Sequence, residues 1–335
     1  MKLLSSLLWF FLAASLVGAA DEKSAPPPDA ATATNEVIET EYQKVLALDD
    51  AAQTEVDQWI RENQAFRAQG GGVPDAELNR RIAERRAPVQ QAYLNFLTAH
   101  PNHARAHVSY GSFLNDTTDA AAALAQWEIA RGLDPSIPAV WNNLANYYAE
   151  NGPTTNAFAD YAKAIELNPH EPLYYHNLGR VIYLFNQEAA GYFHLTEAET
   201  FAKVLTLYRQ AQQLAPDDFP LASDIAQTYN AIRPFPADAA LQAWNDALRL
   251  AHDDVEREGV RLHLARIKIQ TGALDAARTQ LTAVTNAMYA SLKAKLLADL
   301  ELKANPAAAT NAPAATSTSA MPASAATNAA TSPQQ

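Results

Sequence analysis

Two histidines four residues apart, His103 and His107, are the side chains of this sequence best spaced to hold a metal ion together. Residues at i and i+4 share one face of a helix, and two imidazoles on one face can form half of a zinc site. The chain has no cysteine, so it offers no thiolate ligand, cysteine nucleophile or disulfide. We interpret His103 as a residue at a helix start and His107 as a core residue, and we predict no metal site.

Other signatures of catalysis do not appear in the sequence. There is no nucleophile elbow, phosphate-binding glycine loop, dinucleotide-binding glycine cluster or zincin pair. The carboxylates are abundant, with 37 Asp plus Glu against 25 Lys plus Arg, and their spacing is typical of a solvated acidic surface. A net charge of −12 disfavours binding to phosphate backbones or anionic lipid. We therefore predict a protein that is not an enzyme, has no catalytic, cofactor or metal residues, and does not bind nucleic acid.

The first 20 residues have the order of a secretory signal peptide. Met1 and Lys2 precede an apolar run that ends at Val17, and small residues follow up to Ala20. This pattern predicts export to the periplasm or the cell exterior. If the segment is not cleaved it becomes a membrane anchor, because its apolar run is near the lower length limit for a membrane span.

Two further segments lack the bulky apolar side chains that a core requires. Residues 21–35 contain a proline triplet and predict a disordered linker. Residues 304–335 consist almost entirely of Ala, Thr, Ser, Asn and Pro, which predicts a flexible tail, or alternatively a glycosylated stalk or spacer. The folded body is expected between these segments.

A pattern with a period of 34 residues runs through the middle of the chain. A small residue lies in the first half of each copy, flanked by bulky ones except for Arg261 and Lys268 in the fifth copy. A second small residue precedes a bulky one in the second half, except in the third copy, which has Val204 there. Two antiparallel helices can approach closely only where small side chains meet, so the pattern predicts helical hairpins. The first small residue of the five copies is Gly111, Ala145, Gly179, Ala226 and Ala265.

The pattern resembles the tetratricopeptide repeat (TPR), with large residues at the fourth, seventh, eleventh and twenty-fourth positions, small ones at the eighth, twentieth and twenty-seventh, and proline at the thirty-second. The resemblance implies an all-α solenoid of helical hairpins wound into a right-handed superhelix, in an exported bacterial protein. It covers residues 101–291, with repeats at 104–137, 138–171, 172–218, 219–254 and 258–291.

Helical segments are also predicted on both sides of the repeats. Residues 36–100 form an N-terminal extension whose first part, 36–69, has a heptad-like apolar trace. We prefer a helix that folds back on the solenoid through a turn at 70–74 over a homodimeric coiled coil, because polar residues interrupt the seam. Pro88 is expected to kink or restart the second helix. Residues 287–303 predict a helix that caps the last repeat.

The third repeat is longer than the others by an insertion over about 187–199. Thr196 and Glu199 have the spacing of a capping box, which predicts a long helix from Thr196 to about Ala215. Tyr192 and Phe193 are then expected in a loop. They either cover the lengthened helices or form an exposed contact point.

The resemblance further implies that the concave face is lined by the second, fifth, sixth, ninth and twelfth positions of each first helix. Side-chain amides there could pair with the backbone of an extended peptide. In chaperone-binding family members a clamp of Lys, Asn, Asn, Lys and Arg holds a carboxylate. Asn146 and Asn177 match the two Asn of this clamp. The three charged residues of the clamp are replaced here by Asn142, Pro220 and Asp224. The predicted groove residues are Asn142, Asn143, Asn146, His176, Asn177, Arg180, Gln227, Asn230 and Arg266.

The predicted function is a protein–protein interaction scaffold that binds a protein or peptide partner in this groove. The expectation assumes that Asn143 and Asn177 point into solvent. The alternative is a structural spacer of the cell envelope, or a self-associating protein positioned by its tail or N-terminal anchor. A groove that is merely solvated is also consistent with the sequence.

Overall fold

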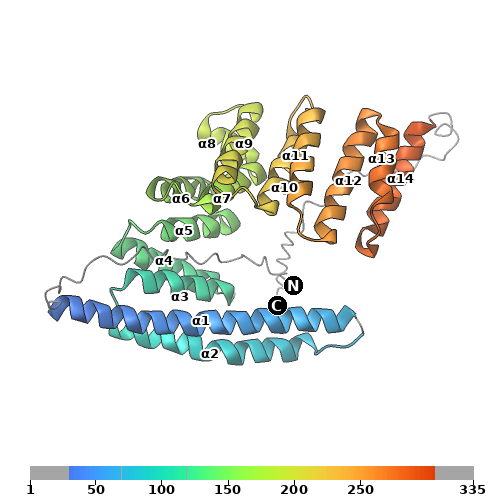
Figure 1. Ribbon diagram of the computed structural model, residues 1–335. Coiled ribbons are helices and arrows are strands. Elements are labelled where there is room, and N and C mark those ends of the chain that lie inside the picture. Colours follow the sequence, from blue (N-terminus) through green and yellow to red (C-terminus); the bar gives the residue numbers. More distant parts are fainter. Residues whose placement is uncertain (1–29, 69, 118, 306–335) are drawn as a thin grey trace, which may run out of the picture.

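The computed structural model describes residues 30–68, 70–117 and 119–305, and all regular elements in these ranges are helices (Figure 1). The predicted signal peptide, the first part of the predicted linker and nearly all of the predicted tail lie outside the described residues. Within the described ranges, no helix combines the length and the apolar composition needed to cross a membrane.

The N-terminal extension is a long antiparallel hairpin of α1 (Ala30–Ala68) and α2 (Asp75–Ala99). The hairpin packs against the first helix of the repeats, as the fold-back hypothesis predicts. The predicted linker is wrong over residues 30–35, which are helical, because an alanine-rich stretch extends an existing helix at little cost. A restart at Pro88 is also wrong: α2 continues through this exposed residue, since the backbone carbonyl that loses its partner there can be hydrated.

Five helix pairs follow α2 along a curved path (Figure 1). In each pair the first helix packs antiparallel on the second, and the second then packs on the first helix of the next pair. The first helices are α3 (Ala104–Asp116), α5 (Pro138–Asn151), α7 (Pro172–Leu184), α10 (Phe219–Thr228) and α12 (Asp254–Thr271). The second helices are α4 (Ala120–Leu133), α6 (Thr154–Leu167), α9 (Glu197–Leu214), α11 (Ala237–Leu250) and α13 (Leu274–Thr282).

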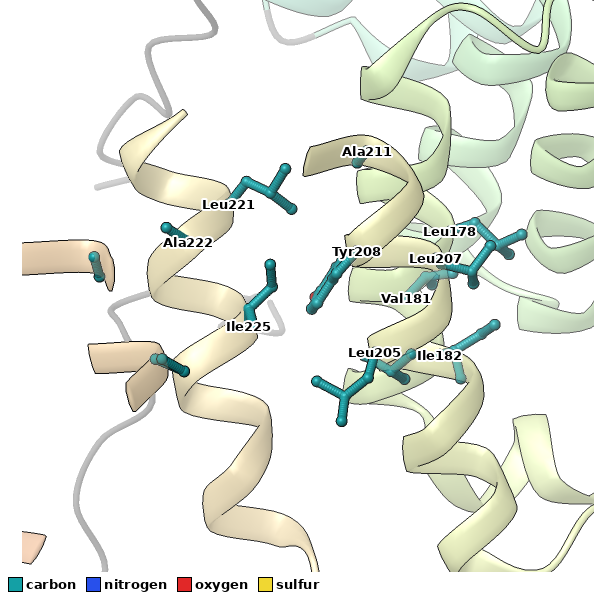
Figure 2. Packing of buried hydrophobic residues seen from close by; sticks show 14 of the residues in the cluster. Leu178, Val181, Ile182, Leu205, Leu207, Tyr208, Ala211, Leu221, Ala222 and Ile225 are labelled. Carbon is teal, nitrogen blue, oxygen red and sulfur yellow. The ribbon is translucent and has the colours of Figure 1, made fainter. Parts of the chain in front are cut away.

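Small residues lie where the paired helices touch. A Cβ atom added to Gly111 would meet the indole of Trp127 at 2.5 Å, and one added to Gly179 would meet Tyr208 Cε1 at 2.5 Å. Tyr208 in turn points from α9 toward the side chains of α10, including Ile225 (Figure 2). The repeat pattern therefore specifies which helices pair and which side chains meet between hairpins, because one bulky ring fills the gap on either side of the contact.

The insertion of the third repeat is a short helix, α8 (Asn186–Phe193), where a loop was predicted. Buried Ala189 anchors α8, and Tyr192 and Phe193 lie 5.4 and 5.5 Å from the ring of Phe158 on α6. The two aromatic residues thus pack on the second helix of the preceding repeat, and Tyr192 remains 40% exposed. The capping box at Thr196 is confirmed, and α9 begins directly after it.

The C-terminal end differs from the predicted boundaries by a few residues. Helix α12 begins at Asp254, not at 258, because the Asp253 side chain caps it. The predicted cap at 287–303 is a short 3₁₀ turn, η2 (Ala287–Tyr289), followed by α14 (Ala290–Ala304). Leu296 and Leu300 of α14 are buried against α12 and α13, so this helix covers the last apolar face of the solenoid.

Candidate functional site

The predicted groove residues are distributed over successive first helices, and those from α3 to α10 form a continuous row. Helix α3 contacts α5, α5 contacts α7, and α7 contacts α10. Asn230 is an exception among the predicted residues, because α10 ends at Thr228 and Asn230 lies in the 3₁₀ turn η1 (Tyr229–Ala231). The others lie on α5 (Asn142, Asn143, Asn146), α7 (His176, Asn177, Arg180), α10 (Gln227) and α12 (Arg266).

Several of these side chains hold neighbouring repeats together. Asn143 Nδ2 donates to Ser112 Oγ of the preceding first helix at 3.1 Å. Asn177 Nδ2 donates in the same way to Asn142 Oδ1 at 3.0 Å, and Asn142 itself is only 6% exposed. The expectation that Asn143 and Asn177 simply point into solvent is therefore wrong. Both are half-buried and take part in contacts between repeats.

The same arrangement recurs at the next step of the solenoid. His176 Nε2 lies 2.8 Å from Asp224 Oδ2, which joins the fifth position of the third repeat to the sixth position of the fourth. At the N-terminal end, Tyr42 OH lies 2.7 Å from Ser109 Oγ, so α1 occupies the place of a preceding first helix. We call these contacts the polar ladder: Tyr42–Ser109, Ser112–Asn143, Asn142–Asn177 and His176–Asp224.

The polar ladder ends between the fourth and fifth repeats. Ser223, at the fifth position of repeat four, has a buried hydroxyl without a hydrogen-bond partner among the described residues. His263, at the sixth position of repeat five, stacks instead on Trp244, with ring centroids 4.0 Å apart and planes 9° from parallel. Burial lowers the pKa of His263 to about 4, so its ring is neutral at physiological pH and packs as an aromatic surface.

The ninth positions form a second row with different properties. Asn146 accepts a hydrogen bond from Tyr161, whereas Arg180, Gln227 and Arg266 have no side-chain hydrogen bond or ion pair within the ranges that the structure describes. Arg180 is exposed, and burial lowers the pKa of Arg266 against the opposing effect of Asp299. We call Arg180, Gln227 and Arg266 the open row, because their donors are available to a bound molecule.

The histidine pair has the roles that its sequence positions predict. His103 caps α3 by accepting from the backbone N–H of Ala106. His107 is 7% exposed and has both ring nitrogens engaged, with Gln126 Oε1 at 2.7 Å and the Pro101 carbonyl at 2.9 Å. Among the described residues, no three His, Asp or Glu side chains are grouped so that they could hold a metal ion.

Sequence reasoning missed the polar ladder and found the open row without distinguishing the two. The available signal was positional but incomplete: two ladder contacts join a fifth to a sixth position, whereas Ser112 of the ladder lies at a ninth position, the position that the open row uses. Whether a polar side chain bonds to the next repeat depends on the stacking angle between hairpins. The repeat pattern does not encode that angle.

No family model matches the sequence, and no curated protein matches it. Solved structures do match its fold. The structure of pilF from Pseudomonas aeruginosa is 14% identical, the match covers 74% of this chain and 98% of that one, and the TM-score is 0.51. YrrB, described as a TPR protein with an unusual peptide-binding site, is 14% identical over 65% of this chain and 99% of its own, with a TM-score of 0.47. MamA from Desulfovibrio magneticus RS-1 is 15% identical over 54% and 92%, with a TM-score of 0.45.

At this level of identity the likeness to pilF concerns the fold alone. It agrees with what the chain itself shows: helical hairpins in tandem, small residues at the eighth position and a bulky ring from the second helix against them. The chain therefore has a TPR-like fold, an all-α solenoid of helical hairpins with an N-terminal hairpin and a C-terminal cap.

Proposed function

We propose that this solenoid is a non-enzymatic interaction scaffold that holds an extended segment of a partner protein along its concave face. The observation that supports the proposal most is the open row. Arg180, Gln227 and Arg266 come from three successive first helices and have no competing partner within the described residues. A ligand that spans the three helices could therefore gain their hydrogen bonds without breaking any contact inside the protein.

The polar ladder supports the proposal by making the face rigid. Its hydrogen bonds join the first helices of repeats one to four, so the spacing between the ninth positions of these repeats is set before a partner arrives. A preorganised face loses less conformational entropy on binding, and more of the contact energy appears as affinity. The asparagines and His176 thus contribute indirectly, and the open row makes the contacts.

The chemistry of the open row favours a segment that carries carboxylates. Two of its three members are guanidinium groups, in a chain whose net charge is −12. Guanidinium binds carboxylate in a two-pronged geometry, and the amide of Gln227 can pair with a peptide backbone. A clamp for a terminal carboxylate is not part of the proposal, because Asp224 at one of its positions pairs with His176.

We propose that the protein acts outside the cytoplasm, because residues 1–20 have the pattern of a signal peptide. Cleavage would leave a free protein, and an uncleaved segment would leave an anchored one. The intact mass of the protein purified from its natural source distinguishes these cases. A mass that corresponds to loss of about 20 residues supports export with cleavage.

Site-specific photocrosslinking tests the proposed function and can capture a partner whose identity is not known in advance. A photoreactive amino acid replaces Gln227 in the open row, and in a matched variant it replaces Asn245, which is exposed on α11. We expect a protein adduct from position 227 and none from position 245. Identical adducts from the two positions, or none from position 227 while another surface position yields one, would contradict binding on the concave face.

A further inference from the structure

The N-terminal hairpin is longer than the repeats that it packs against. Arg86 of α2 donates to the backbone carbonyl of Asp116 at the end of α3 and to Gln53 of α1, which marks where contact with the solenoid ends. Beyond this point the two helices extend past α3 (Figure 1). We call residues 53–67 of α1 and 75–86 of α2 the arm.

The arm has a defined structure of its own. Asn63 closes the hairpin by accepting from the backbone N–H of Val73 at 2.7 Å, and Arg67 forms an ion pair with Asp75 at 2.7 Å. Val56 and Leu78 are buried between the two helices. These contacts hold α1 and α2 in a fixed relation up to the tip.

One face of the arm remains apolar and without a third layer. Phe66 is 58% exposed, and Trp59, one heptad earlier on the same side of α1, is covered only in part by the guanidinium of Arg81 at 4.5 Å. The arm residues Val56 and Leu78 belong to none of the three core clusters of the described chain. Two helices alone bury too little apolar surface to be a stable unit, so this face is suited to covering by another element.

Charge on this face points to the identity of that element. The spacing of Glu55 and Glu62 places them with Trp59 on the α1 side, while the spacing of Arg81 and Arg85 places them on the α2 side. Arg85 Nε lies 2.7 Å from Glu55 Oε2, which shows that the two rows adjoin. The face is therefore acidic along α1 and mainly basic along α2, where Glu77 lies one turn before Arg81. Such a face is complementary to itself after rotation about an axis that runs along the arm.

We propose that the arm is a self-association surface, through which two copies of this chain pair face to face. Each α1 then lies over the partner copy's α2, so Glu55 and Arg85 of both copies alternate, and Trp59 and Phe66 enter the core of a four-helix bundle. The face is about 22 Å long and about 20 Å wide from helix geometry. Two such faces bury on the order of 1,000 Å² in total, which is the lower limit for a specific interface.

The oligomeric state of the full chain tests this pairing. We expect a mass in solution of about twice the monomer's 36.3 kDa by light scattering, with a concentration-dependent transition to monomer. F66E should shift the protein to monomer and keep the helical circular dichroism spectrum of the wild type, because the side chain is exposed within one copy. M288E, at a 69% exposed residue near the other end of the chain, should remain a dimer. A wild-type protein that is monomeric at all accessible concentrations overturns the proposal.

Spin labels distinguish the arm from any other self-association surface. Because the chain has no cysteine, A65C and S291C each place one label per copy, on the arm and on α14 respectively. We expect a short, narrow distance between labels at position 65 and a long or undetectable one at position 291. A dimer with the reverse result uses another surface and overturns the proposal. These outcomes are independent of the proposed groove, since a monomer could still bind a partner there.

Discussion

At the scale of single residues, the closest approach between helices is at the eighth position of the repeats. Gly179 lies against Tyr208, and a Cβ there would be 2.5 Å from the ring. We expect Gly179→Ala to lower the unfolding free energy by about 1–3 kcal/mol through overpacking. Gly191→Ala is the matched control, because an added Cβ meets nothing within 4 Å in α8 and alanine favours the helix. Urea unfolding measures both, and equal stabilities would show that the register of the repeats is wrong.

The polar ladder gives a second prediction at this scale. Asn177→Ala removes the donor to Asn142, whose buried amide oxygen then loses its partner from the next repeat. We expect a loss of about 1–3 kcal/mol of unfolding free energy. Gln227→Ala, in the open row, should leave stability nearly unchanged. If thermal unfolding shows Asn177→Ala to be as stable as Gln227→Ala, the ladder does not stabilise the solenoid.

Asp160 on α6 gives a prediction about pH. It is 8% exposed, and burial raises its pKa to about 6 despite the nearby guanidinium of Arg131. The folded state therefore holds this proton more tightly than the unfolded state, and the associated stability is present at acidic pH and lost as pH rises through about 6. Asp160→Asn should raise the unfolding free energy at pH 7.5 and have a smaller effect at pH 4.5.

Denaturant titrations of this variant at the two pH values provide the measurement. The exposed Asp50→Asn variant is the control, and it should follow the pH trend of the wild type. A gain for Asp160→Asn that is equal at both pH values would mean that its carboxylate is already ionised in the folded protein throughout this range.

At the scale of elements, Glu258 fixes the connection to the capping helix. Its carboxylate accepts from the backbone N–H groups of Thr285 and Asn286, at 2.9 and 2.7 Å. The Asn286 bond contributes most to a lowered pKa of Glu258, so this contact is present at neutral pH and is lost only in strongly acidic solution. We expect Glu258→Ala to increase local opening of α14 without unfolding the rest of the solenoid.

Amide hydrogen exchange measures this effect element by element. In Glu258→Ala the amides of α14 should exchange faster, while those of α5 and α6, far from the cap, should keep their protection. Unchanged protection in α14 would show that the burial of Leu296 and Leu300 holds the helix without the carboxylate.

The element scale also shows why much of the fold could be predicted. Helix pairing follows from small residues such as Gly111 and Ala145, because each has to meet a large side chain of the partner helix. The capping box at Thr196 fixed the start of α9 for a local reason. Helix α8 could not be predicted in this way. It is eight residues long, has no capping side chain, and is held by the packing of Ala189, Tyr192 and Phe193 on neighbouring helices.

The candidate site was predictable only in part. Repeat positions indicated which residues lie on the first helices, except for Asn230 in η1, but they could not separate Arg180 from Asn177 on the same helix. Arg180 has no side-chain hydrogen bond or ion pair among the described residues, whereas Asn177 donates a hydrogen bond to Asn142. That difference depends on the angle between adjacent hairpins and on the residue type at the facing position of another repeat. It appears only when the hairpins are stacked.

At the scale of the whole molecule, the solenoid has an inner face built in two rows. The polar ladder holds the first helices of repeats one to four together, and the open row of Arg180, Gln227 and Arg266 is left to contact a partner. The arm provides a separate surface at the N-terminal end. Partner binding and self-association can therefore occur on one molecule without competing for the same residues.

The measurement that tests binding by the open row most directly is the affinity of the crosslinked partner for two matched variants, determined by isothermal titration calorimetry. One variant removes both arginines of the open row, Arg180→Ala with Arg266→Ala, and the other removes the 71% exposed Arg249 of α11. We predict at least a tenfold loss for the first, about 1.4 kcal/mol, a loss that shrinks at high salt, and no loss for the second. Equal affinities for both variants and the wild type would contradict binding by the open row.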